Sequence, residues 1–156
     1  MSKEERSAIS EFLAPFSADI RERALWLRDF VWDLYPQTNE LIYDNYNAVA
    51  FGWSPTEKVG DTFCSIAVGR TSGNVHFGFY HGAVLSDPEK ILLGNGNQYR
   101  YLLVKNTDEF PTSYIIQLLK EAYSNSLAKI KDPKLIVTGK TITKSVSPVK
   151  RAKKKK

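Results

Sequence analysis

The sequence contains few of the residues that cross-link small proteins or equip them for chemistry. Among 156 residues there are one cysteine, Cys64, and two histidines. A single thiol excludes an intramolecular disulfide and gives no reason to expect an oxidising compartment. No apolar run approaches the roughly 20 residues that span a bilayer, and no apolar signal core follows the charged N-terminus. We therefore expect a cytoplasmic protein whose hydrophobic core alone stabilises the fold.

The common catalytic and cofactor motifs are also missing from the sequence. It has no HExxH pair, no cysteine cluster and no G-x-S-x-G elbow. Gly94-x-Gly96 lacks the third glycine of a dinucleotide fingerprint. His76 and His81 fall on opposite faces of one expected strand, which is poor geometry for a shared metal, and a mid-strand Cys64 favours a buried, inert thiol. An enzyme is therefore the weakest hypothesis, because no nucleophile or acid–base pair is evident.

Charge is present but unevenly distributed along the chain. The net charge is +5, from 22 basic and 17 acidic residues. Eleven of the basic residues lie in 129–156 beside a single acid, Asp132. Six of them close the chain, at Lys150, Arg151, Lys153, Lys154, Lys155 and Lys156. We predict that 129–156 is a flexible lysine-rich tail, which either contacts nucleic-acid phosphates weakly or only keeps the domain soluble.

Helical periodicity marks two long segments. Residues 18–35 carry one apolar stripe, preceded by Ser17 as a helix N-cap and followed by Pro36 as a helix stop. The stripe consists of Ile20, Ala24, Leu27, Val31 and Leu34. A second helix is expected from residue 111 or 112 to about residue 127, and a short element at 3–13. Such amphipathic helices typically pack on a sheet.

Strand periodicity dominates the middle of the chain. Alternating apolar residues predict four strands, at 46–53, 62–68, 74–80 and 99–104. Turn-rich breaks between the first three favour hairpins and antiparallel pairing. Two short helices are also expected, at 39–43 and 87–92. The order predicts an α+β fold, an antiparallel β-sheet of about four to five strands with helices packed on one face. Its domain covers 17–128 after an N-terminal segment, 1–16.

Aromatic residues on or beside these strands suggest a ligand surface. Tyr46, Tyr80 and Tyr99 are positioned to face an exposed or concave side of the sheet, and His76 and Arg100 lie near its rim. A surface of this kind suits an apolar or planar ligand, or a segment of a partner protein. The alternative is ordinary core packing with half-exposed tyrosines.

One stretch resembles a known family. Residues 78–100 combine a strand, a glycine, a Leu-x-Asp-Pro step at 85–88, a Leu-Leu run into a Gly-x-Gly turn and an arginine, Arg100, that opens the next strand. This pattern, with the long helix and the apolar C-terminal helix, is similar to the YdhG-like family of small bacterial domains over roughly 17–128. The resemblance implies a compact α+β domain.

The same resemblance raises the question of metal binding, since one YdhG-like relative is regarded as a frataxin-like iron chaperone. Iron delivery would use clustered carboxylates as oxygen donors. Asp29 and Asp33, one turn apart on the long helix, are the candidate ligands. The alternative is that these carboxylates only form a solvated helix face.

Three hypotheses on function follow from the sequence. The first is a non-enzymatic binding or carrier protein with an unidentified small ligand or protein partner. The second is a frataxin-like iron chaperone. The third is a nucleic-acid-associated protein that uses the basic C-terminal tail. The sequence identifies neither a cofactor nor an oligomeric state.

Overall fold

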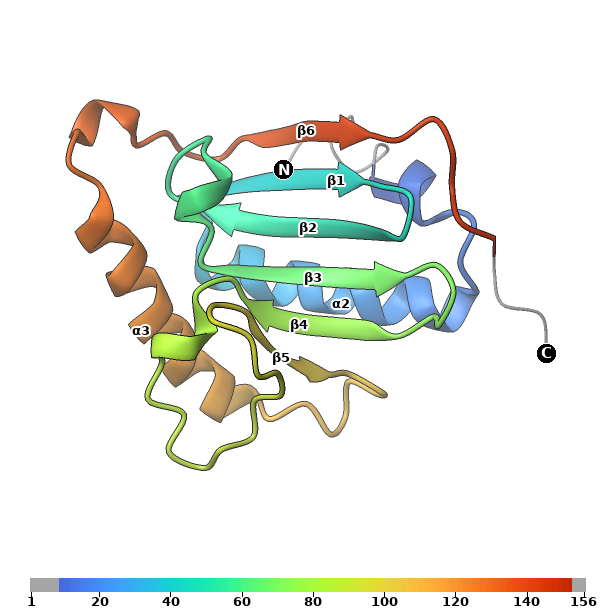
Figure 1. The fold of residues 1–156 in the computed structure, drawn as a ribbon, viewed down its shortest axis with the longest axis horizontal. Helices are drawn as coiled ribbons and strands as arrows, with labels where there is room; N and C mark the ends of the chain where they lie inside the picture. Colours follow the sequence, from blue (N-terminus) through green and yellow to red (C-terminus); the bar gives the residue numbers. More distant parts are fainter. Residues whose placement is uncertain (1–8, 153–156) are drawn as a thin grey trace.

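The computed structural model describes residues 9–152, and its central element is a six-stranded sheet (Figure 1). The strands are β1 (Asn39–Asp44), β2 (Ala48–Ser54), β3 (Cys64–Gly69), β4 (Val75–Phe79), β5 (Arg100–Leu103) and β6 (Thr141–Val146). They lie in the order β5-β4-β3-β2-β1-β6. The pairs from β1 to β5 are antiparallel, and β6 is parallel to β1. The α+β class is confirmed, but the sheet is mixed and has six strands.

Two helices pack against this sheet. α2 (Ala18–Leu34) lies across one face, and α3 (Thr112–Lys129) packs at one end of the strands (Figure 1). The predicted cap of α2 is confirmed, because the Ser17 side chain accepts a hydrogen bond from the Ile20 N–H at 3.4 Å. Residues 9–13 are also helical, and short 3-10 turns lie at Val59–Asp61, Gly82–Val84 and Pro133–Leu135.

The hydrophobic core lies between α2, α3 and one face of the sheet. Alternate residues of the central strands point into it, as the period of two predicts. These buried residues are Val49, Phe51, Trp53, Cys64, Ile66, Val68, Val75, Phe77 and Phe79. Phe30 of α2 packs edge-on against Phe77, and Tyr123 of α3 packs against Phe63. The large apolar side chains of β2, β3 and β4 therefore gather on the face that α2 covers.

The short helix expected at 39–43 is wrong, because these residues form β1. A helix of five residues has little stability of its own. As a strand, the same residues pair with β2 on one side and β6 on the other. Pairing on both sides satisfies the backbone hydrogen bonds of a segment whose Leu41 and Ile42 side chains are fully buried.

The helix expected at 87–92 is also wrong. Asp87 and Lys90 have positive φ angles of 34° and 53°, which interrupt a right-handed helix. The Asp87 carboxylate instead accepts hydrogen bonds from the N–H groups of Ile91 and Leu92 and from the Tyr114 hydroxyl. The half-buried Asp87 carboxylate therefore organises this loop and ties it to α3.

The prediction of a flexible tail from residue 129 is wrong for the part of the tail that forms β6. The Glu40 N–H donates to the Lys140 carbonyl at 2.8 Å, and the Ser147 N–H donates to the Asp44 carbonyl at 2.8 Å. The unpaired edge of β1 gives this short β-prone segment a partner that its own sequence does not reveal. Residues 153–156 lie outside the described residues.

Candidate functional site

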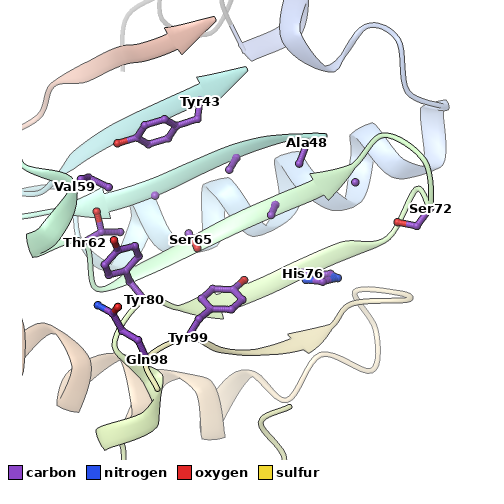
Figure 2. A pocket seen from close by; sticks show the side chains of 14 residues that line it. Tyr43, Ala48, Val59, Thr62, Ser65, Ser72, His76, Tyr80, Gln98 and Tyr99 are labelled. Atoms are coloured by element: carbon purple, nitrogen blue, oxygen red, sulfur yellow. The ribbon is translucent and has the colours of Figure 1, made fainter. Parts of the chain in front are cut away.

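The face of the sheet opposite α2 carries a hollow of about 630 Å³ (Figure 2). We call it the trough. Its floor consists of small residues from two neighbouring strands, Ala48, Ala50 and Gly52 of β2 and Ser65, Ala67 and Gly69 of β3. The side chains that surround the floor are mostly larger, namely Tyr43, Val59, Thr62, Ser72, His76, Tyr80, Gln98 and Tyr99. The trough is thus a recessed strip between aromatic walls.

The flat floor follows from the strand register. Ala48 lies opposite Gly69, Ala50 opposite Ala67 and Gly52 opposite Ser65. Each cross-strand pair therefore combines two side chains of no more than two heavy atoms. Since alternate residues point to opposite faces, the same strands that supply the large core residues leave only small ones here.

A stack of three rings supplies two residues of one wall, His76 and Tyr99. The Tyr99 and Tyr101 rings are 5.6 Å apart and nearly parallel, and Tyr101 stacks on His76 at 4.4 Å. Tyr99 lies directly over Gly78, where an added Cβ would approach Tyr99 Cε1 to 2.5 Å. The Ser65 side chain is close enough to the Tyr99 hydroxyl to lower its pKa. Glycine at position 78 thus allows this tyrosine to lie flat on the sheet.

Burial favours the uncharged forms of Tyr43, His76 and Tyr99 in the trough. Burial raises the pKa of Tyr99 to about 12, although the Ser65 hydrogen bond lowers it. Burial raises the pKa of Tyr43, and the neighbouring Tyr80 raises it further. Burial lowers the pKa of His76, which favours the neutral imidazole. No Asp, Glu, Lys or Arg is among the described residues that line the trough.

Two polar side chains stand at one end of the trough. Thr62 is 4% exposed, and its Oγ1 has no hydrogen-bond partner within residues 9–152. Gln98 Nε2 lies 2.8 Å from His81 Nδ1, and His81 Nε2 lies 2.9 Å from the Gly60 carbonyl. Because the carbonyl only accepts, Nε2 donates and Nδ1 accepts from the Gln98 amide. His81 thereby connects the turn that contains Gly60 with the loop that contains Gln98, beside this end of the trough.

The structure brings together three of the five predicted ligand residues. His76, Tyr80 and Tyr99 all line the trough (Figure 2). Tyr46 lies in the β1–β2 hairpin, 45% exposed, and is not among the lining residues. Arg100 follows Tyr99 directly, and neighbouring residues of a strand point to opposite faces of the sheet. Its guanidinium donates hydrogen bonds to the Gly96 and Tyr99 carbonyls, and it does not line the trough. Binding by any of these residues stays a prediction.

Sequence reasoning missed the floor and much of the opposite wall. Tyr43 was hidden because its segment was expected to be a helix. The floor had a readable signal, since small residues alternate at 48, 50 and 52 and again at 65, 67 and 69. These small residues alternate with the large apolar residues that identified the strands. The same alternation therefore predicts both faces of the sheet, a core face of large residues and an opposite face of small ones.

The described part of the chain contains no cluster of donor side chains that would support the metal-binding hypothesis. Asp29 and Asp33 are both exposed on α2. Within residues 9–152, no group of three or more His, Cys, Asp or Glu side chains is arranged to hold a metal ion. Iron binding by this pair therefore stays a prediction without further support.

Two of the basic residues predicted to contact nucleic acid make contacts within the protein. Lys150 Nζ lies 3.2 Å from Asp44 Oδ2 and donates to the Asp44 carbonyl at 2.7 Å. The backbone N–H of Arg151 donates to the Tyr46 carbonyl, and the Nη1 atom of the Arg151 side chain lies 3.3 Å from Asn47 Oδ1. These contacts hold the chain against the β1–β2 hairpin. Lys153, Lys154, Lys155 and Lys156 lie outside the described residues.

Comparison with known proteins adds no relative. No family model, no curated protein and no solved structure matches this chain. The YdhG-like resemblance therefore stays a prediction from the residues at 78–100.

A membrane-spanning helix is absent from the described residues: none of the helices within 9–152 combines the necessary length and apolar character.

Proposed function

We propose that this protein is a non-enzymatic binding protein that holds a small molecule in the trough. The trough itself carries the proposal. Its volume of about 630 Å³ falls within the range of small-molecule sites, roughly 300 to 1,000 Å³. Such sites are mostly apolar with a few well-placed polar groups, and the small floor, the tyrosine walls and Thr62 fit that description.

The composition of the uncovered face supports this proposal. An antiparallel sheet with one solvated face normally places polar side chains on that face. Here the floor carries Ala48, Ala50, Gly52 and Ala67, while α2 covers the opposite side. Contiguous exposed apolar surface rimmed by polar groups is typical of an interaction site. A ligand seated on this floor would remove it from water.

We also propose the setting and the family of this activity. The buried, free Cys64 supports a cytoplasmic location, where thiols stay reduced. The motif at 78–100 supports membership in the YdhG-like family. Ligand binding in the trough depends on neither the location nor the family, so the binding proposal is tested separately.

Filling the trough tests the proposal. We expect native mass spectrometry of protein purified from its host to detect a retained small molecule. We also expect the neutral dye Nile red to bind with blue-shifted emission. Ala50→Trp places a large ring on the floor and should weaken dye binding by about tenfold or more, equivalent to ~1.4 kcal/mol. Ala128→Trp, on the exposed side of α3, is the matched control.

Two results would contradict the proposal. One is dye binding that Ala50→Trp leaves unchanged, which would locate the dye elsewhere. The other is a dimer or a protein complex that Ala50→Trp dissociates while no small molecule or dye binds. The trough would then be a protein interface.

A further inference from the structure

We propose that the ligand of the trough is an uncharged, flat aromatic molecule whose single hydrogen-bonding group contacts Thr62. This inference rests on the proposed binding function and specifies its ligand. Three independent features of the trough carry it: the shape of the floor, the absence of charged lining residues and an unpaired buried hydroxyl.

The floor selects a flat ligand. The cross-strand pairs Ala50–Ala67 and Gly52–Ser65 present an even surface on which a planar ring system can lie. Figure 2 shows Tyr43 on one side of this floor and Tyr80 and Tyr99 on the other. β1 and β4, the strands beneath the two walls, are separated by β2 and β3, so their backbones lie about 14 Å apart at strand spacings of about 4.8 Å. The Tyr99 ring covers Gly78 on the β4 side, which leaves the floor over β2 and β3 open to a planar ring system.

The lining selects against charge. No Asp, Glu, Lys or Arg side chain is among the described lining residues, so a charged ligand would lose water without gaining an ion pair. His76 does not supply a charge, since its ring stacks on Tyr101 and burial lowers its pKa. A neutral ligand avoids this desolvation cost.

Thr62 fixes the position of the polar group. Its side chain lies over the floor, because an added Cβ at Gly52 would approach Thr62 Cγ2 to 2.9 Å. Its Oγ1 is buried and has no partner among the described residues, and an unpaired buried hydroxyl is costly. Figure 2 places Thr62 beside Val59 and Tyr80 at one end of the trough. Rotation about the Thr62 Cα–Cβ bond exchanges the positions of Cγ2 and the buried Oγ1. A ligand hydroxyl or carbonyl at that end would favour this rotation and satisfy the hydroxyl.

A matched pair of naphthalenes tests this ligand class. We expect 2-naphthol, which is neutral at pH 7, to bind about tenfold more tightly than the 2-naphthoate anion in calorimetric titration. Thr62→Val removes the hydroxyl at nearly constant shape and should weaken 2-naphthol binding about fivefold or more. Thr62→Ser keeps the hydroxyl and should retain the affinity. Circular dichroism melting verifies that each variant folds.

Each failure has a distinct meaning. Equal or tighter binding of 2-naphthoate, still abolished by Ala50→Trp, would overturn the neutral-ligand inference and leave the binding function intact. Unchanged 2-naphthol affinity in Thr62→Val would overturn the role of Thr62. Nile red binding without binding of either naphthalene would overturn the proposed ligand class. Absence of binding by all three probes would overturn the binding function itself.

Discussion

Gly78 controls the shape of the trough at the scale of a single residue. It lies on β4 beneath the Tyr99 ring, with Ser65 opposite it on β3. Any side chain here would occupy the space of that ring, so Tyr99 would have to leave the sheet. The loss would affect both the packing of the aromatic stack and the wall of the trough.

We therefore expect Gly78→Ala to lower the free energy of unfolding by about 1–3 kcal/mol, as is usual for overpacking, and to weaken Nile red binding. Urea denaturation and dye titration measure the two effects. Gly60→Ala is the matched control, because a Cβ at Gly60 meets nothing within 4 Å. Equal effects of both substitutions would show that the Tyr99 contact is not responsible.

At the scale of the elements, β6 completes the surroundings of β1. Arg28 of α2 forms a two-pronged ion pair with Glu40 of β1, with N···O distances of 2.6 and 2.7 Å, and both side chains are fully buried. The Thr141 hydroxyl of β6 donates to the same carboxylate at 3.1 Å. A buried ion pair is stable only when its polar atoms are well satisfied, so β6 supports an interaction that joins α2 to the sheet.

Truncation after residue 138 removes β6 and should destabilise the protein. We expect a loss of about 3 kcal/mol or more, since each lost ladder hydrogen bond contributes about 1 kcal/mol. The exposed edge of β1 should also promote aggregation. Thermal unfolding and light scattering measure these effects. Truncation after residue 152 keeps β6 and is the control. An unchanged melting temperature in the shorter protein would show that β6 contributes nothing to stability.

At the scale of the whole molecule, two tyrosines link the stability of the fold to high pH. Burial, with smaller contributions from Cys64 and Tyr123, raises the pKa of Tyr35 to about 12. The pKa of Tyr99 is likewise about 12, mainly through burial. An unfolded tyrosine titrates near about 10. Between these values the unfolded state releases protons that the folded state retains, so rising pH favours unfolding.

The contribution of these two tyrosines to the free energy of unfolding should therefore be constant below about pH 10. The free energy of unfolding should then fall between about pH 10 and 12. Denaturation of the wild type at pH 8 and pH 11 measures the loss. Tyr35→Phe and Tyr99→Phe each remove one titrating hydroxyl, so each should reduce the loss. If both variants lose as much stability as the wild type, other groups cause the alkaline sensitivity.

The sequence by itself determined the elements whose signals are local. The period of two placed the core residues of β2, β3 and β4, the period of 3.6 placed α2 and α3, and Ser17 marked a helix start. His76, Tyr80 and Tyr99 were identified because they lie on or beside these well-marked strands. Local hydrogen bonding and side-chain alternation are properties of a segment, so a segment's own residues reveal them.

Only the tertiary structure decided which segments meet. β1 became a strand because β2 and β6 flank it. β6 formed because β1 leaves an open edge far earlier in the chain: Glu40 and its partner Thr141 are 101 residues apart. The trough likewise needs β1, β2, β3 and β4 side by side before its floor and walls exist. Such partners are distant in sequence, and their pairing energy appears only once the sheet has assembled.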